Sequence, residues 1–120
     1  PMEHELSAFY DITHGAGLAL LTPYWMQYVV REETLPRFVE YGVNVWGIDP
    51  EQEDMAIARQ AITKTREFFD SIGMPSHLSE LDIDDTHFDV MAMKAAAGGL
   101  AYGFVPLDKQ DVRRIYEMAL

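Results

Sequence analysis

The feature that most constrains the fold is the spacing of the apolar residues, which follows steps of three and four in every long segment of the chain. Leu35 and Phe38 share one face, and Met55 and Ala58 begin a second stripe that extends to Ile72. Residues at this spacing line one face of an α-helix, whereas a half-buried strand alternates at every second position. No segment sustains such alternation, so the sequence predicts an all-α helical bundle of about five or six helices without a sheet.

Capping and helix-breaking residues predict where these helices begin and end. Thr34 precedes one helix as a capping residue and Gly47 ends it, while Asp49 and Pro50 are typical of the N-cap and first position of the next helix. Asp108 is the expected N-cap of the last helix. The expected helices cover about residues 14–30, 35–46, 50–72 and 109–120, and one more carries Phe88, Met91 and Ala95.

Length and charge limit the number of domains and the kinds of partner. A chain of 120 residues has the size of one globular domain, so residues 1–120 are expected to form a single all-helical domain. Nine Lys and Arg against twenty Asp and Glu give a net charge of −11, and the basic residues are scattered along the chain. Neither a nucleic acid nor an anionic membrane is therefore expected as a partner.

The absence of cysteine excludes a disulfide framework, a thiolate metal site and a thiol nucleophile. A reducing, cytoplasmic setting fits this composition. The most apolar segment, Leu18–Val30, has thirteen residues and contains Pro23, whereas a membrane-spanning helix needs about twenty residues. We therefore expect a buried helix with a proline kink in this segment, and no membrane as a partner.

Two of the four histidines, His4 and His14, stand ten positions apart ahead of the apolar helix. On one unbroken helix they would lie about 80° apart in azimuth and about 15 Å apart in rise, too far to share a metal. The break at Asp11–Thr13 matters because a bend can return the second histidine toward the first. The residues alone leave two interpretations open: a paired site for zinc or ferrous iron, and isolated capping or solvated histidines.

The other motifs favour structural roles. Gly15 and Gly17 match the first two glycines of a dinucleotide-binding fingerprint, but Leu20 replaces the third and no strand is predicted before them. These small residues are expected to allow another backbone or a ligand to approach closely. His77 and His87 lie among acidic and turn residues, and we expect both to be solvated or to cap a helix.

Three segments carry a further signal: HELSAFYDITHGAGLALLTPYWMQYV, RFVEYGVNVWGI and AAAGGLAYGFVPLDKQDVRRIYEMAL. Together they resemble the C-terminal part of the iron-containing (group III) alcohol dehydrogenases, in particular the NAD(P)H-dependent butanol dehydrogenase branch. The similarity covers nearly all 120 residues. It implies an all-helical domain that follows a nucleotide-binding α/β domain, with metal and substrate held in the cleft between the two.

The resemblance also implies roles for the two histidines. In that family the metal ligands are an aspartate and three histidines, and the last two histidine ligands are the outer members of the pattern H-x3-H-x9-H. Matched onto this sequence, His14 is the final metal ligand. His4 takes the place of the middle histidine, a catalytic residue near the reacting centre that relays a proton, as imidazole can near neutral pH. The first histidine of the pattern would stand one position before Pro1.

For the intact family, the resemblance implies iron or zinc and NAD(P)H as cofactors, and a small alcohol or aldehyde as substrate, interconverted by hydride transfer. With one matched metal ligand and no nucleotide-binding domain, the chain alone is expected to be incomplete and inactive and to bind no cofactor tightly. A truncated product or isolated domain fits the start at Pro1.

Two alternatives stay open for the chain. One is a free-standing helical interaction module that pairs with itself or with a separate nucleotide-binding domain, and the other is an inert gene remnant. An apolar surface left where the nucleotide-binding domain would dock predicts a homo-oligomer.

Overall fold

The computed structural model describes residues 2, 5, 14–97 and 105–120. The helices are α2 (His14–Val29), α3 (Leu35–Trp46), α4 (Asp54–Ser71), the 3₁₀ helix η1 (Leu78–Leu81), α5 (Phe88–Ala97) and α6 (Lys109–Met118). No strand occurs in these ranges, which confirms the all-α prediction. Within the same ranges, none of the helices combines the length and the apolar character that a bilayer span requires.

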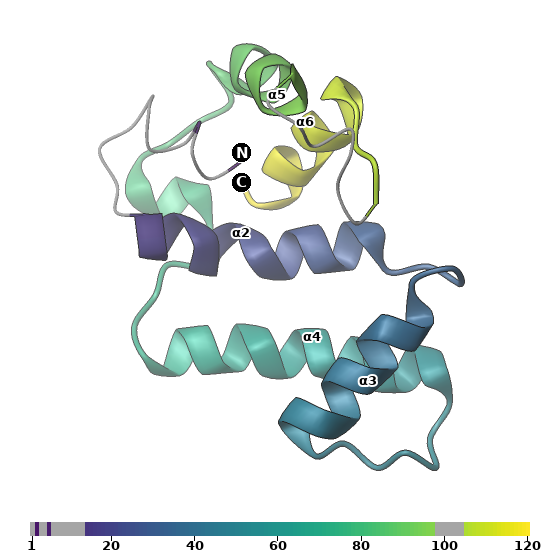
Figure 1. The fold of residues 1–120 in the computed structure, drawn as a ribbon. Coiled ribbons are helices and arrows are strands. Elements are labelled where there is room, and N and C mark those ends of the chain that lie inside the picture. Colours follow the sequence, from purple (N-terminus) through teal and green to yellow (C-terminus); the bar gives the residue numbers. More distant parts are fainter. Residues whose placement is uncertain (1, 3–4, 6–13, 98–104) are drawn as a thin grey trace.

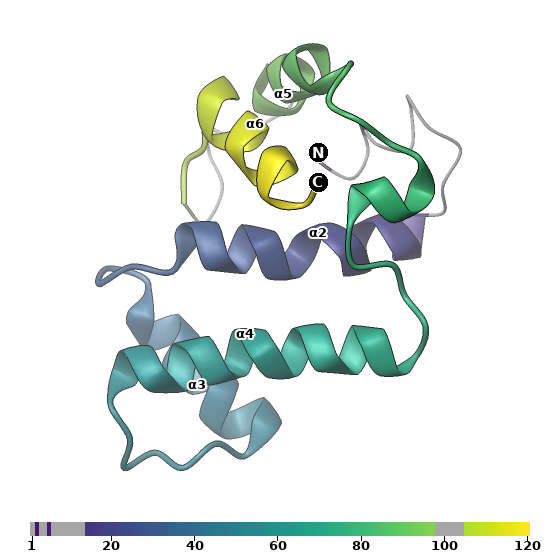
Figure 2. The same ribbon diagram turned by 180° about the vertical axis from the view of Figure 1, so that it is seen from behind.

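Helix α2 lies in the middle of the molecule, with α5 and α6 on one side and α4 on the other (Figures 1 and 2). Helix α3 packs against α4 on the side remote from α5 and α6. Met2, near the start of the chain, lies against α6, where the Tyr116 hydroxyl donates to the backbone oxygen of Met2 at 2.7 Å. The central helix therefore has a packing partner on each side.

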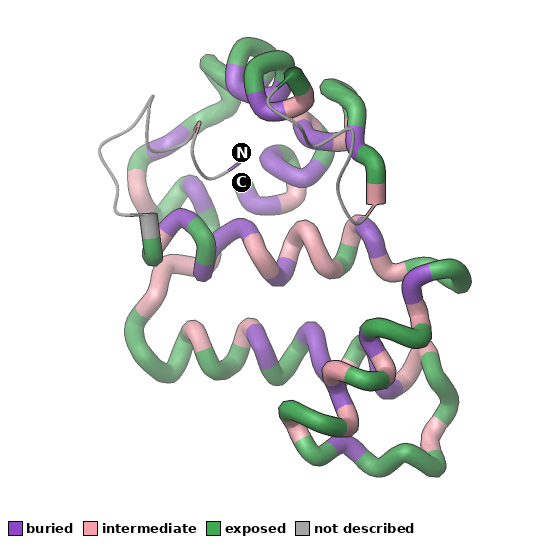
Figure 3. The backbone as a smooth tube through the Cα atoms, in the orientation of Figure 1, coloured by how far each residue is buried: buried purple, intermediate pink, exposed green. Residues whose placement is uncertain are grey.

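The buried side chains form two clusters. Figure 3 colours the backbone by the burial of each residue. The larger one gathers around α2, α5 and α6, and it contains large, fully buried side chains such as Phe88 and Tyr116. The smaller one lies between α3 and α4, and its buried members are Ile48, Ile57 and Ala61. Because apolar burial supplies most of the driving force for folding, the two clusters mark the two regions that hold the helices together.

Helix α3 has the predicted bounds, but Thr34 acts differently from the expected cap. Its side chain makes no capping hydrogen bond to the helix. Instead its hydroxyl donates to the Val29 oxygen at 2.8 Å and accepts from the Arg31 N–H at 2.9 Å, which closes the turn between α2 and α3. Gly47 ends the helix as predicted: its φ of 65° is left-handed, which suits glycine, and its N–H donates to the Val43 oxygen at 3.2 Å.

The predicted start of the next helix was wrong by about one turn. Helix α4 begins at Asp54, with Glu53 as its N-cap. Asp49, the expected cap, instead accepts through its Oδ1 from the backbone N–H of Glu51 at 3.0 Å. This local side-chain bond competes with helix formation. The segment around Pro50 therefore forms a turn ahead of α4.

Asp108 caps α6 as predicted. Its carboxylate accepts from the backbone N–H of Asp111 at 2.9 Å, and the Asp111 carboxylate accepts from the backbone N–H of Asp108 at 3.0 Å. This reciprocal capping box satisfies two N–H groups that a helix start leaves free. The Asp111 Oδ1 also accepts from the Tyr28 hydroxyl at 2.5 Å, so the start of α6 is tied to α2.

Candidate functional site

The structure places His14, the predicted metal ligand, at the first residue of α2. His4, the predicted catalytic residue, lies outside the described residues, so the pairing of the two imidazoles stays a prediction. Gly15, the next residue of α2, is exposed, and a Cβ added there would meet no atom within 4 Å. None of the described residues therefore makes the close approach expected at Gly15.

The described part of the chain contains no group of three His, Asp or Glu side chains that could hold a metal ion. A neutral imidazole suits iron or zinc, but a protein site needs further donors. The resemblance assigns the chain one donor, His14, and a metal held there would need donors from outside the described residues.

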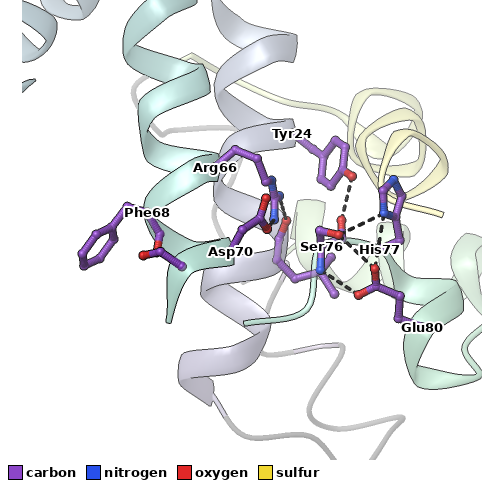
Figure 4. Close-up of polar contacts among 9 residues, drawn as sticks. Tyr24, Arg66, Phe68, Asp70, Ser76, His77 and Glu80 are labelled. Carbon is purple, nitrogen blue, oxygen red and sulfur yellow. Dashed lines mark hydrogen bonds and ion pairs between the residues drawn. The ribbon is translucent and has the colours of Figure 1, made fainter. Parts of the chain in front are cut away.

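The helix that begins with His14 is fixed by an arginine from α4 (Figure 4). Pro23 lies inside α2 and is fully buried. A proline removes one backbone hydrogen bond from a helix and crowds the preceding turn. In that turn, the Leu20 carbonyl accepts from the Arg66 Nη2 at 3.0 Å. Asp70 Oδ1 lies 3.9 Å from the Arg66 Nη1, an ion pair too long for a hydrogen bond, and Nη1 is buried without a hydrogen-bond partner among the described residues.

Tyr24 adds a second attachment in the same turn of α2 (Figure 4). Its ring lies under the Arg66 guanidinium, with 5.2 Å between the Arg66 Cζ and the ring centroid. Burial raises the pKa of Tyr24 above its ordinary value, although the Arg66 charge opposes this. The phenol therefore stays protonated at neutral pH and donates to the Ser76 oxygen at 2.6 Å. Together these contacts fix α2 against α4 and the segment before η1.

That segment also contains one of the two remaining histidines. The Glu80 carboxylate accepts from the backbone N–H of Ser76 at 2.9 Å and from its hydroxyl at 3.0 Å, and these bonds lower the pKa of Glu80. His77 is exposed, with its Nδ1 3.1 Å from the Ser76 Oγ. The prediction of a solvated His77 agrees with this position, and His87 is exposed as well.

Sequence reasoning missed Arg66 and Tyr24. A partial signal was present, because Pro23 lacks the N–H that would bond the Ala19 carbonyl, and the carbonyl that Arg66 reaches, that of Leu20, is the next one in the same turn. The identity of that donor depends on how α4 packs on α2, and the apolar spacing does not specify which of the nine basic residues reaches the Leu20 carbonyl.

Comparison with known proteins identifies what this arrangement is similar to. The family model described as "Fe-containing alcohol dehydrogenase family, C-terminal" matches residues 1–120. NADH-dependent butanol dehydrogenase A of Clostridium acetobutylicum is 50% identical over 119 residues, which are 98% of this chain and 31% of that protein. A probable NADH-dependent butanol dehydrogenase of Bacillus subtilis is 38% identical over 120 residues, 99% of this chain and 31% of that protein.

Solved structures agree with the sequence comparisons. The aldehyde reductase YqhD from E. coli superposes with a TM-score of 0.84 at 28% identity, over 99% of this chain and 31% of that one. The NADH-dependent butanol dehydrogenase A from Thermotoga maritima gives 0.81 at 28% identity, over 98% of this chain and 31% of that one. The chain thus spans about a third of the length of these relatives. It belongs to the Fe-containing alcohol dehydrogenase family, and it corresponds to the family's C-terminal, helical part.

Proposed function

We propose that this chain supplies the helical, metal-binding part of an NAD(P)-dependent alcohol dehydrogenase that interconverts a small alcohol and its aldehyde by hydride transfer. The observation that carries the proposal is the family match over residues 1–120, with the predicted ligand His14 at the first residue of α2. Relatives named as butanol dehydrogenases and as an aldehyde reductase support this substrate class.

In this proposal the chain's own residues hold and orient the reacting groups. His14 is a metal ligand, and Arg66 and Tyr24 keep its helix in place. When bound, iron or zinc supplies a Lewis acid for the alcohol or aldehyde oxygen. His4 exchanges a proton with solvent close to that oxygen, a role that suits imidazole because its pKa is near neutral. The proposal keeps the reducing cytoplasm as the compartment, which the absence of cysteine fits.

A chimera tests the proposal directly. The matched C-terminal part of the Clostridium acetobutylicum enzyme, 31% of its length, is replaced by this chain. We expect the folded chimera to oxidise butanol with NAD and to reduce butyraldehyde with NADH. His14→Ala should abolish activity and metal content, and His4→Ala should lower kcat while the metal is retained. His87→Ala, at an exposed histidine at the start of α5, is the matched control and should leave both unchanged. A folded, metal-loaded chimera without turnover would overturn the proposal.

We also propose that the 120-residue chain alone is inactive and binds metal weakly, since one ligand cannot replace a complete donor set. The test is to load the pure chain with ferrous iron or zinc, supply NADPH and butyraldehyde, and measure turnover and retained metal. Turnover that disappears in His14→Ala would contradict this part of the proposal.

Self-association of the chain is part of the same proposal. Several large apolar side chains are exposed, among them Val45, Phe68 and Ile72, and exposed apolar surface favours association. The net charge of −11 opposes it. Sedimentation over a wide concentration range is expected to detect a dimer or larger species, and a monomer throughout would contradict the prediction.

A further inference from the structure

A hollow of about 370 Å³ opens between α2 and α4, on helices that both ribbon views show side by side (Figures 1 and 2). It is lined by Gln27 and Val30 from α2 and its end, and by Arg59, Ile62 and Thr63 from α4. Ile62 is buried and Val30 half-buried, whereas the three polar side chains are exposed. The hollow thus combines an apolar base with a polar rim, as small-molecule sites commonly do.

The polar groups of the rim are available to a ligand. The Arg59 guanidinium, the Gln27 amide and the Thr63 hydroxyl make no hydrogen bond or ion pair with any residue in the described ranges. Thr65, two positions further along α4, shows the contrast, because its hydroxyl donates to the Ala61 oxygen at 2.8 Å. Thr63 makes no such bond within its own helix, so its hydroxyl keeps its full capacity to bind.

The charge of the hollow is opposite to that of the chain. Among the residues that the structure describes, no carboxylate lines it, in a chain with twenty Asp and Glu. A neighbouring hollow of about 230 Å³ shares Arg59 and Thr63, and it adds Lys64 and a single carboxylate, Glu67. The described lining of the two hollows thus contains two cations and one carboxylate, which favours an anionic ligand.

We propose that this hollow binds a short-chain aliphatic carboxylate, with the carboxylate on Arg59 and the hydrocarbon chain on Val30 and Ile62. A guanidinium offers a planar pair of donors that matches a carboxylate, and the Thr63 hydroxyl and the Gln27 amide add further donors. The site is separate from His14 and does not depend on the dehydrogenase function. Because the whole chain is strongly negative, binding is weak and weakens further with salt.

The test is an NMR titration of the ¹⁵N-labelled chain at constant ionic strength, with butyrate and with its uncharged isostere butyramide. Butyrate should shift the amide signals of residues 27–30 and 59–63 saturably, and butyramide should not. From propionate to valerate each methylene should tighten binding about two- to fourfold, the upper value corresponding to full burial of a methylene. That preference separates a free aliphatic acid from a protein carboxylate, since a glutamate side chain presents no more hydrocarbon than propionate.

Variants of residues inside and outside the hollow test whether the shifted NMR signals report binding at this site. Arg59→Gln should weaken butyrate binding about tenfold or more, and Thr63→Val should weaken it by a smaller factor. Arg114→Gln removes an exposed charge from α6, outside both hollows, and should leave binding unchanged. The proposal is overturned if butyrate gives no saturable shift, if butyramide shifts the same signals equally, or if affinity stops rising beyond propionate. If Arg59→Gln does not fold, Thr63→Val and the butyramide comparison decide the question.

Discussion

The two buried clusters are built in different ways, although α4 takes part in both. Ala58 and Ile62 on α4 join the larger cluster, whereas Ile57 and Ala61 on the same helix join the smaller one. The larger cluster is filled by bulky side chains, with the rings of Phe88 and another aromatic residue, Tyr116, 5.4 Å apart between centroids.

The smaller cluster depends on the close approach of the Gly42 backbone to side chains of α4. A Cβ added at Gly42 of α3 would lie 2.9 Å from the Ile57 Cγ2. Its edge is incomplete: Phe68 is 49% exposed beside Trp46, and the Trp46 indole N–H is buried without a hydrogen-bond partner in the described structure. The larger cluster should therefore be most sensitive to loss of volume, and the smaller one to added volume.

Truncation in the larger cluster should give the largest effect. Phe88→Ala removes a fully buried ring and leaves a cavity, which should lower the free energy of unfolding by about 3–5 kcal/mol. Phe68→Ala is the matched control: this ring is half-exposed, so its loss should cost about 1 kcal/mol or less. Urea denaturation followed by circular dichroism measures both. Equal losses would show that the two clusters do not differ as described.

Added volume in the smaller cluster should give the next largest effect. In Gly42→Ala the new methyl group meets the Ile57 Cγ2 at 2.9 Å and the Ala61 Cβ at 3.3 Å. Such overpacking costs about 1–3 kcal/mol, which exceeds the gain of about 0.5–1 kcal/mol from replacing glycine inside a helix. Gly15→Ala meets no atom within 4 Å and should be neutral or slightly stabilising. The contrast disappears if thermal unfolding finds both variants equally stable.

Loss of the Arg66 contacts that join α4 to α2 should have an intermediate effect on the free energy of unfolding. Arg66→Ala removes the donor to the Leu20 carbonyl and the cation over Tyr24, which should cost about 1–2 kcal/mol. Hydrogen exchange should show faster opening of the amides of α2 around Pro23, with little change in α3. Arg66→Lys keeps the charge without the planar fork and should recover part of the loss. Uniform acceleration in every helix would argue against a local attachment.

Local chemistry explains how much of this fold the sequence could predict. The end of α3 at Gly47 and the cap of α6 at Asp108 depend on residues within one turn, and both predictions are confirmed. The start of α4 was wrong because Asp49 bonds its own turn. Ile72 was expected on the buried stripe but is 52% exposed, since the helix ends at Ser71 and the helical period no longer applies.

For the candidate site, the sequence led to the proposed ligand but not to the contacts that hold its helix. The resemblance led to His14, and the structure starts α2 at that residue as the helical pattern predicted. The contacts that hold this helix were not predictable. Arg66 is 46 positions from Leu20 and Ser76 is 52 positions from Tyr24. Such pairs form only after α2, α4 and the segment before η1 have packed, and no spacing rule along the chain encodes them.

The smallest predicted effect is a difference in pH dependence between a hydrogen bond beside the larger cluster and one beside the smaller cluster. Tyr28 donates to the Asp111 Oδ1 at 2.5 Å beside the larger cluster, and Tyr41 shares a 2.6 Å hydrogen bond with the Thr65 hydroxyl beside the smaller one. Each Tyr→Phe variant should cost about 1 kcal/mol at neutral pH. The Tyr28 bond has a titrating acceptor, whereas a threonine hydroxyl does not titrate in this range.

The pKa shifts give the direction of the pH dependence. Burial opposes ionisation of Asp111, but hydrogen bonds from Tyr28 and Asp108 hold its pKa below the ordinary 3.8. The contribution of the ionised carboxylate to the free energy of unfolding is therefore complete above pH 3.8, and it is lost as the pH falls through the depressed pKa. The bond to Asp111 raises the pKa of Tyr28 from 10.0 to about 12, so that contribution is complete below pH 10 and is lost as pH rises toward 12. The cost of Tyr28→Phe, measured by urea unfolding from pH 3 to 7, should therefore shrink at the acid end, while that of Tyr41→Phe stays constant. An acid-independent cost at Tyr28 would mean that the Asp111 carboxylate does not stabilise the junction of α2 and α6.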